Sequence, residues 1–272
     1  MGGMRIHPTA YVETGAQLGE DTFIGPFCHI GADVVLGDRS EVMSHAVIMG
    51  ATTIGENAKI YPHAVLGGAP QNNKHKGGRT VLEIGKNCII REGVTMHRGS
   101  DSSFGRTVVG DDCMFLAYAH VAHDCILGNH VTFSNNVMIG GHVVIGDSVI
   151  IGGGGAVHQF VRVGHHAFIG GLAALTADLI PYGMAVGVHA WLGGLNITGM
   201  KRSGLERREI HALRHAVSML FDRTKPVRMR AADVLAANPE SKTVADVIAF
   251  IGEDSKRSFC TPKIGFDGAM KD

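Results

Sequence analysis

The chain has 272 residues, of which 45% are hydrophobic, and its 25 Lys and Arg residues balance its 25 Asp and Glu residues. This balance leaves no overall charge to attract nucleic acid or an anionic membrane, and no apolar run is long enough to span a bilayer. The opening residues MGGMRIHPTA lack the apolar region of a signal peptide, and five cysteines beside a large core argue against a disulfide framework, so we expect a cytoplasmic protein with reduced thiols.

An aliphatic residue, Met or Phe recurs every six positions through most of the chain. This register holds without a miss over residues 6–66, 84–96 and 109–175. Glycine takes the second position in 14 of the 26 hexads, where we expect the chain to turn because glycine has no Cβ to clash. Positions one and five of a short strand can both face inward. The pattern predicts an all-β parallel β-helix over residues 6 to about 180, with three hexads in each triangular coil of 18 residues.

Two segments interrupt the hexads, at residues 67–83 and 98–108. Interruptions of a solenoid form loops on one face, which is often the binding face. The first interruption is polar and glycine-rich and contains Gln71, Asn72 and Lys74. It can be a solvated loop or part of a binding site, and its composition leaves both possibilities open. We assign residues 1–190, with these two loops, to one β-helix domain.

The pattern changes after the last hexad. Apolar residues spaced by three and four positions predict helices over residues 205–223, 227–237 and 243–250, followed by an irregular end. We assign residues 191–272 to a C-terminal helical domain. This domain is expected to close the end of the prism, where an open β-helix would expose unpaired backbone groups.

Three histidines fall within one residue of a common line along the prism, because residues 18 apart share an angular position. They are His123, His142 and His158, at non-core hexad positions, and they predict an outward ladder with Asp124 beside His123. Three neutral imidazoles could hold Zn²⁺ with an open ligand position, as a hydrolase or hydratase needs. One histidine oriented by a carboxylate could instead act as a general base, although adjacent strand residues usually point apart. The spacing leaves both chemistries open.

Several segments resemble, in sequence, order and spacing, the UDP-N-acetylglucosamine acyltransferases of lipid A biosynthesis. They are IGPFCHIG, HRG at His97, AHVAHDC around His123, IGGH at His142, AVHQF around His158 and NITGMKR from Asn196. The resemblance implies a left-handed β-helix and a homotrimer with active sites between neighbouring prisms. It also implies an enzyme without cofactor or metal that transfers a 3-hydroxyacyl chain from acyl carrier protein to the 3-position of the UDP sugar, the first step of lipid A biosynthesis.

The resemblance further implies roles for individual residues. His123 matches the general base, Asp124 its orienting partner, and the amide of Gly141 the donor to the developing oxyanion. Gly171 and His189 match the positions that set acyl length, and a small residue at Gly171 implies a longer chain. The residues that match ligands of the nucleotide sugar or of the acyl carrier arm are Gln71, Asn72, Lys74, His97, His120, His142, His158, Gln159, Asn196 and Arg202.

Three positions depart from the family pattern: Thr198 replaces an acidic residue, Ser203 replaces an arginine, and Asn72 replaces an aspartate. A carboxylate beside a 3-amine would stabilise the ammonium form, which cannot attack a thioester, whereas a neutral amide would not. We therefore hypothesise that the enzyme accepts or prefers the 3-amino analogue of the sugar. Two alternatives stay open: a zinc enzyme like the carbonic anhydrases of this fold, and an acetyl-CoA-dependent acetyltransferase.

Overall fold

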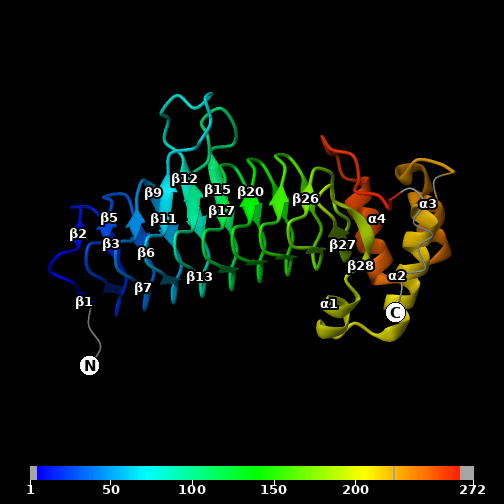
Figure 1. Ribbon diagram of the computed structural model, residues 1–272, viewed down its shortest axis with the longest axis horizontal. Helices are drawn as coiled ribbons and strands as arrows, with labels where there is room; N and C mark the ends of the chain where they lie inside the picture. The colour runs from blue at the N-terminus through cyan, green and yellow to red at the C-terminus, as the bar shows by residue number, and fades with distance from the viewer. Residues whose placement is uncertain (1–4, 223, 264–272) are drawn as a thin grey trace.

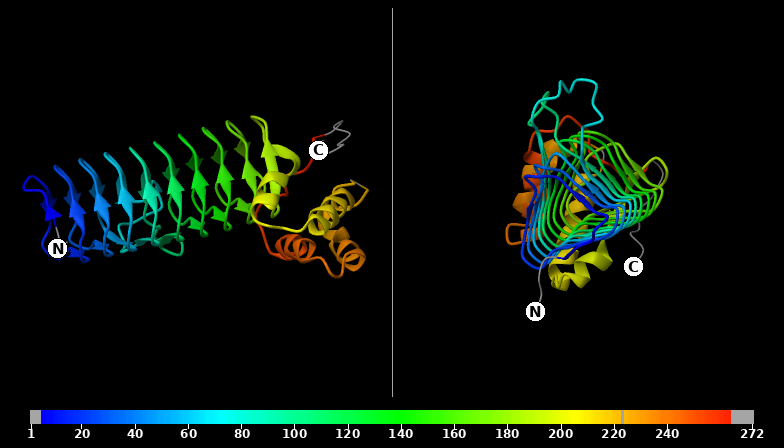
Figure 2. Two further views of the ribbon diagram at one scale, coloured as in Figure 1. Left: turned by 90° about the horizontal axis from the view of Figure 1, so that it is seen from below. Right: turned by 90° about the vertical axis from the view of Figure 1, so that its left-hand side faces the viewer.

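The computed structural model describes residues 5–222 and 224–263 and shows a long triangular prism followed by a helical domain (Figure 1, Figure 2). Short parallel strands stack into three sheets, one for each side of the prism, which Figure 2 shows end-on. The first strand, β1 (Arg5–Ile6), and the helical domain lie at opposite ends of the long axis. The hexads therefore correspond to the sides of a β-helix, as the repeat predicts.

Each sheet collects every third strand of the prism. The first sheet contains β1 (Arg5–Ile6), β4 (Phe23–Ile24), β7 (Glu41–Val42), β10 (Lys59–Ile60), β13 (Ile89–Ile90), β16 (Met114–Phe115), β19 (Thr132–Phe133), β22 (Ile150–Ile151), β25 (Phe168–Ile169), β27 (Gly183–Val186) and β28 (Trp191–Leu195). The second contains β2 (Tyr11–Val12), β5 (His29–Ile30), β8 (Val47–Ile48), β11 (Val65–Gly68), β14 (Thr95–His97), β17 (His120–Val121), β20 (Met138–Ile139), β23 (Ala156–Val157) and β26 (Ala174–Leu175). The third contains β3 (Gln17–Leu18), β6 (Val35–Leu36), β9 (Ala51–Ile54), β12 (Val81–Ile84), β15 (Arg106–Val109), β18 (Ile126–Leu127), β21 (Val144–Ile145) and β24 (Arg162–Val163).

The lead residues of the hexads fill the interior of the prism. Ile30 and Ile48 are fully buried on neighbouring coils of the second sheet, and the rings of Phe115 and Phe133 pack edge to face with centroids 5.0 Å apart. Burying one such side chain contributes about 1.5–3 kcal/mol to stability. Position five is also internal, and it includes Cys125; all five cysteines are buried free thiols.

The corners of the prism lie at the fourth hexad position rather than at the second. Non-glycine residues adopt positive φ there, including Asp124 (59°), His142 (62°) and Phe160 (65°), which stack along the corner between the second and third sheets. The glycine at position two has a different function, because a Cβ on Gly146 would lie 2.6 Å from the backbone nitrogen of His165 in the next coil. The expected reason for that glycine was therefore wrong: it permits close stacking of coils and does not form the bend.

Both interruptions of the hexads project from this same corner (Figure 1). Strand partners in adjacent coils are normally 18 residues apart, as in Ile126 and Val144. Across the first interruption Ala51 pairs with Val81, and across the second Val81 pairs with Arg106. The first loop lies between β11 and β12 and the second between β14 and β15, so they occupy neighbouring coils and contact each other.

A hairpin and four helices follow the last coil. β27 and β28 form an antiparallel pair that extends the first sheet, and the predicted boundary after residue 190 falls between these two strands. The helices are α1 (Ile197–Arg202), α2 (Arg207–Leu220), α3 (Val227–Ala237) and α4 (Lys242–Gly252). The last three correspond to the predicted helices, although residue 223 lies outside the described residues. Neither the hairpin nor α1 was predicted, because neither has a long apolar period. Within the described ranges, none of the helices has the length and hydropathy needed to cross a membrane.

Arg162 of the prism forms a buried ion pair within the prism and also contacts the helical domain. Arg162 donates from Nε to Asp178 (2.8 Å) and from Nη1 to Glu253 (2.7 Å), and its guanidinium lies 4.3 Å from the ring centroid of Phe250. The side chain of Asp178 is fully buried, so its charge needs this partner. The segment that follows α4 is thereby held against the last coils.

Candidate active site

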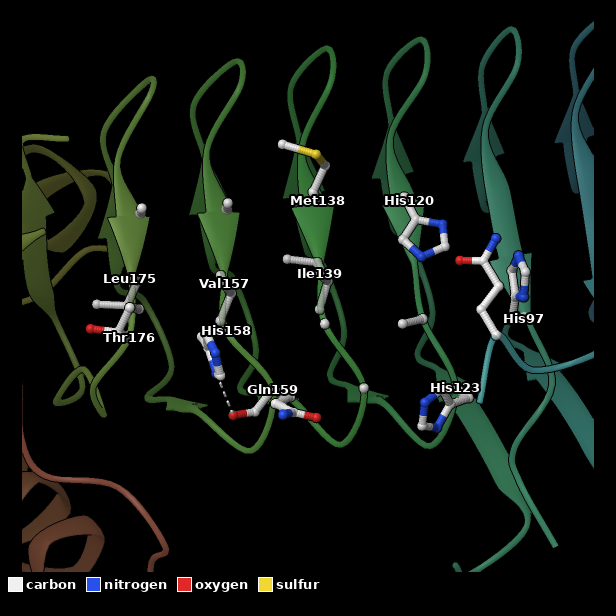
Figure 3. Close-up of a pocket in the computed structure, with 16 residues that line it drawn as sticks. His97, His120, His123, Met138, Ile139, Val157, His158, Gln159, Leu175 and Thr176 are labelled. Atoms are coloured by element: carbon white, nitrogen blue, oxygen red, sulfur yellow. Dashed lines mark hydrogen bonds between the residues drawn. The ribbon is translucent and has the colours of Figure 1, made fainter. Parts of the chain in front are cut away.

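An open groove of about 520 Å³ runs along the second sheet, beside the corner that carries the loops. Figure 3 shows that it crosses several coils, with His97, His120 and His123 at one end and Thr176 at the other. Its walls are mostly apolar side chains and glycine, with three histidines at one end and His158, Gln159 and Thr176 farther along. The lining residues are Gln71, His97, His120, Ala122, His123, Met138, Ile139, Gly140, Gly141, Ala156, Val157, His158, Gln159, Ala174, Leu175 and Thr176.

His123 and Asp124 form a hydrogen-bonded pair at the polar end of the groove. The distance from His123 Nδ1 to Asp124 Oδ2 is 2.7 Å, and the exposed fractions of the two side chains are 12% and 0%. Adjacent strand residues point apart, but the left-handed conformation of Asp124 at the corner turns its carboxylate back onto the imidazole. Because a carboxylate accepts, Nδ1 carries the donated proton and Nε2 keeps a free lone pair. This is the protonation state that a general base requires.

The second loop holds the carboxylate of Asp124 in place. The backbone N–H of Ser100 donates to both carboxylate oxygens at 3.1 Å, and that of Gly105 donates to Oδ1 at 3.2 Å. The N–H of Asp124 itself donates to Thr107 Oγ1 at 2.9 Å. These bonds compensate for burying the charge. The loop therefore orients the pair from behind and is more than a decorated turn.

The first loop is clasped to the second. Asn72 Nδ2 donates to Ser100 Oγ (3.2 Å) and to Ser102 Oγ (3.4 Å), while His75 Nδ1 lies 3.0 Å from Asp101 Oδ1. Asp101 also accepts backbone hydrogen bonds from the first loop, which together with His75 lower the pKa of its carboxyl. The clasp thus connects the first loop, through Ser100, to the carboxylate beside His123. Of the three predicted residues of this loop only Gln71 lines the groove; Asn72 and Lys74 do not.

His97 and His120 sit together beside His123, with ring centroids 5.3 Å apart. His97 Nδ1 is 2.7 Å from the carbonyl oxygen of Ala69 and so donates to it, whereas His120 Nδ1 pairs with the hydroxyl of Thr95 at 2.8 Å. Burial lowers the pKa of both imidazoles, and for His120 burial together with the nearby histidines lowers the pKa to about 4. Both rings are therefore neutral at pH 7 and can exchange hydrogen bonds with a bound ligand.

The predicted histidine ladder is only partly present. The ring of His142 meets that of His123 edge to face at 5.1 Å, but it then stacks on Phe160 at 4.4 Å and does not line the groove. His158 lies farther along the groove, beside Gln159 (Figure 3). The prediction that three imidazoles stack on one line is wrong because Phe160, not His158, occupies the corner position above His142. Three imidazoles therefore do not converge on a zinc ion.

One metal-ligand grouping does occur among the described residues, formed by His123, Asp124 and His142, whose ligand atoms lie within 4.8 Å of one another. Asp124 already accepts bonds from Ser100, Gly105 and His123, so a metal would have to displace some of them. The hydrogen-bonded arrangement fits an orienting carboxylate better than a metal ligand.

Gly141 faces the imidazole of His123 across the corner. Its carbonyl accepts from the N–H of Phe160, whereas its own N–H has no partner within the described part of the chain. An amide that is free, borders a groove and lies beside a possible base can donate to a negatively charged oxygen.

The other predicted residues lie outside the groove. Asn196 caps α1, since its side chain accepts from the Gly199 N–H and donates to the carbonyl of His166, and Arg202 is exposed at the end of the same helix. Gly171 is exposed at a different corner, and exposed His189 is bridged to Ala174, which does line the groove. Other positions at which the family pattern differs also lie on α1: Thr198 is exposed and Ser203 ends the helix.

Some lining residues were not predicted. Met138, Ala156 and Ala174 hold the outward position immediately before a hexad lead on the second sheet, so they form the apolar floor of the groove. The hexad register predicts that these three side chains point outward, but it identifies them as lining residues only once the side of the prism that carries the site is known. Arg257, which contacts His158 from the C-terminal segment, has no signal of this kind.

Comparisons with known proteins agree with this architecture. The family description "Udp N-acetylglucosamine O-acyltransferase; Domain 2" matches residues 178–260, and bacterial transferase hexapeptide repeats match residues 15–50, 33–68 and 106–141. The acyl-[acyl-carrier-protein]–UDP-N-acetylglucosamine O-acyltransferase of Bartonella henselae is 67% identical over 268 residues, covering 98% of this chain and 97% of that protein. The protein of the same name from Brucella ovis is 69% identical over 259 residues, covering 95% of this chain and 93% of that protein.

Solved structures give the same result. The UDP-N-acetylglucosamine acyltransferase from Campylobacter jejuni is similar with a TM-score of 0.88 and 36% identity, covering 95% of this chain and 100% of that one. The UDP-N-acetylglucosamine acyltransferase from Francisella novicida is similar with a TM-score of 0.89 and 32% identity, covering 96% of this chain and 95% of that one. These findings confirm the left-handed parallel β-helix with a helical C-terminal domain, and they confirm the resemblance seen in the sequence motifs.

Proposed function

Because the chain belongs to the UDP-N-acetylglucosamine O-acyltransferase family, we propose that it transfers an (R)-3-hydroxyacyl chain from acyl carrier protein to the 3-position of UDP-N-acetylglucosamine, the first step of lipid A biosynthesis. The main support in the structure is the His123–Asp124 pair, 2.7 Å apart, at the polar end of a long groove. Such a groove suits a substrate that has a polar head and a long apolar chain. The relatives named above carry acyl carrier protein and the nucleotide sugar in their names.

In the proposed reaction His123 acts as the general base. Its Nε2 accepts the proton of the sugar 3-hydroxyl while that oxygen attacks the thioester carbonyl carbon. The negative charge that develops on the carbonyl oxygen is stabilised by the N–H of Gly141. The carbon–sulfur bond then breaks, and the protonated His123 returns its proton to the departing thiolate of the carrier. Asp124 keeps the imidazole in the required tautomer and stabilises its positive charge, so the reaction needs no metal or cofactor.

The acyl chain is proposed to lie over the apolar floor of the groove. Met138, Ala156 and Ala174 follow one another on successive coils, about 4.8 Å apart, away from His123. The two alanines leave room for a chain where larger side chains would fill it. His189, bridged to Ala174, lies at the far end and is proposed to help set acyl length.

We propose that three copies assemble and that a neighbouring copy closes each groove. The groove is open along its length, and the corner next to its sheet exposes Phe27, Tyr118 and Leu172, whose exposed fractions are 58%, 67% and 71%. Gly171 lies on that exposed corner and not in the groove of its own chain, so it can reach an acyl chain only in another copy. Light scattering of the purified protein tests the assembly: the proposal expects the mass of a trimer.

The first loop is proposed to contact the sugar, with Asn72 permitting a 3-amino acceptor. The remaining predicted ligands, including Lys74, Asn196 and Arg202, are proposed to bind the nucleotide or the carrier arm from the adjoining copy, because they lie outside the groove of their own chain. Since its proposed donor is acyl carrier protein, we also propose a cytoplasmic location.

The functional test is an assay of the purified protein with UDP-N-acetylglucosamine and 3-hydroxyacyl donors on acyl carrier protein and on coenzyme A. The proposal expects turnover with the carrier-bound donor without added metal, undiminished by a chelator. An acetyl-CoA-dependent acetyltransferase would instead use the short coenzyme A donor. A zinc enzyme would contain stoichiometric metal and would lose activity with the chelator.

A further inference from the structure

The segment after α4, residues 253–263, returns to the wall of the prism and is here called the C-terminal strap (red in Figure 1). The N–H of Cys260 donates to the carbonyl of Asp178 (2.7 Å), and the N–H of Asp178 donates to the carbonyl of Ser258 (2.8 Å). Farther on, the carbonyl of Thr261 accepts from the N–H of Leu192 (3.0 Å). The strap is therefore an ordered part of the wall, and its side chains have fixed places beside the last coils.

Arg257 of the strap reaches two residues that line the groove. Its Nη2 lies 2.5 Å from Nδ1 of His158, and its Nε and Nη2 donate to the carbonyl oxygen of Gln159 at 3.1 and 2.8 Å. About one hundred residues of sequence separate Arg257 from these partners. The helical domain thus contributes directly to the geometry of the groove.

The contact with Arg257 determines which nitrogen of His158 carries the proton. A guanidinium can only donate hydrogen bonds, so Nδ1 of His158 must accept and must be unprotonated. The neutral ring then carries its proton on Nε2. The carbonyl oxygen of Gln159 also lies near Nδ1, at 3.3 Å (dashed line in Figure 3), and would favour a proton there. The shorter contact with an obligate donor decides between the two.

We propose that Arg257 is a positioning residue of the active site, which fixes His158 as a hydrogen-bond donor through Nε2 toward the ligand in the groove. The acceptor we assign to it is an oxygen of the nucleotide sugar, since oxygen atoms supply the acceptors of that substrate. The identity of this ligand rests on the proposed function. The tautomer of His158 does not, because it follows from contacts within the resting protein.

A simpler role for Arg257 is to add positive charge near an anionic substrate. Lys256 provides a matched control, because it is the neighbouring cation of the strap but lies over the ring of Phe160, 4.6 Å from its centroid, and makes no contact with His158. Lys256→Met removes the same charge as Arg257→Met and leaves the donor to Nδ1 in place. Arg257→Gln removes the charge but keeps an N–H donor.

The first experiment measures the tautomer directly. The protein is labelled with ¹⁵N-histidine, and the signals of His158 are assigned by their loss in His158→Gln. The wild type and Lys256→Met should show a protonated Nε2 and an unprotonated Nδ1, whereas Arg257→Met should show the proton on Nδ1, next to the carbonyl of Gln159. A wild-type His158 already protonated on Nδ1, or an Arg257→Met tautomer unchanged from wild type, would overturn the proposal.

The second experiment compares steady-state kinetics of the same variants. Arg257→Met should raise the KM for the nucleotide sugar at least tenfold with kcat within threefold of wild type, Arg257→Gln should recover part of this loss, and Lys256→Met should stay within twofold. Equal KM increases in Arg257→Met and Lys256→Met would show that charge alone matters and would contradict the proposal. A wild type without acyl transfer would refute the proposed function instead, and the tautomer measurement would still decide this inference.

Discussion

The backbone of Gly141 lies against the imidazole of His123, so closely that a Cβ at this position would be 2.7 Å from Cε1 and 2.8 Å from Nε2 of the ring. Real Cβ atoms do not approach other atoms to this distance. The ring of His123 cannot move away freely, because its Nδ1 is hydrogen-bonded to the fully buried carboxylate of Asp124. The absence of a side chain at residue 141 is thus a condition for the position of the proposed base.

We therefore expect Gly141→Ala to lower kcat by about 10²-fold, since a displacement of about 1 Å in an active site can have an effect of that size. Gly153→Ala is the matched control, because the added Cβ would meet only the carbonyl oxygen of Asn135 at an ordinary 3.5 Å. Initial rates and thermal unfolding are measured for both variants. Wild-type activity in Gly141→Ala would show that the proposed base is not His123 in this position.

A second prediction concerns acid stability and follows from His120. Its folded-state pKa of about 4 is below the value of about 6.5 expected in the unfolded chain, so the unfolded state binds more protons between these values. The associated stability is fully present above about pH 6.5 and decreases as the pH falls toward 4. We expect the urea midpoint to fall over this range, and to fall less steeply in His120→Gln.

The control for this measurement is His130→Gln, because the side chain of His130 is 63% exposed and lies outside the groove. The urea midpoint of that variant should fall with pH as steeply as that of the wild type. The prediction is contradicted if the urea midpoint of His120→Gln depends on pH as steeply as that of the wild type at the same protein concentration. In that case His120 is not held neutral by burial.

A third prediction tests the apolar floor of the groove. Ala174→Leu adds bulk several coils away from His123, where the end of a long acyl chain is proposed to lie. We expect the variant to lose at least tenfold in kcat/KM with the longest hydroxyacyl donor used by the wild type and to change less than threefold with short donors. Val35→Leu, an outward position of the third sheet in an early coil, should leave the donor profile unchanged. An equal loss with all donors would contradict a role in chain length.

A fourth prediction concerns the acceptor. Asn72→Asp introduces the carboxylate that we expect to hold a 3-amine as ammonium, so turnover of the 3-amino sugar should fall at least tenfold more than turnover of the 3-hydroxyl sugar. The variant also loses the donors to Ser100 and Ser102, which affects both substrates alike. The ratio of the two rates is therefore the informative quantity. A wild type strictly specific for the 3-hydroxyl sugar would refute the hypothesis.

The fold could be predicted from the sequence because six-residue periodicity places every third hexad in the same sheet. The same arithmetic brought His123 near His142, whose rings meet at 5.1 Å. It failed for His158, because His158 is at the second hexad position and His142 is at the fourth. The second position lies on the side of the prism, whereas the fourth lies at the corner. Spacing gives the angle of a residue around the coil, but it does not give the direction of a side chain beside a bend.

The hexad pattern could not predict the hydrogen bond between His123 and Asp124 for a related reason. Two adjacent residues meet only because Asp124 adopts a left-handed conformation, which most residues at the fourth hexad position share. The hydrogen bonds from Ser100 and Gly105 depend on how an irregular loop folds, and irregular loops have no period. The same holds for Arg257, whose position depends on the docking of a domain that follows the repeats.

The most direct test of the account is the rate of acyl transfer by His123→Ala compared with the wild type, with carrier-bound 3-hydroxyacyl donor and nucleotide sugar both saturating. General base catalysis typically contributes 10²–10⁴-fold, so we expect kcat to fall by about that factor, with a thermal midpoint near that of the wild type. A folded His123→Ala protein with wild-type kcat would show that the histidine at the polar end of the groove is not the base, and the proposed mechanism would be wrong.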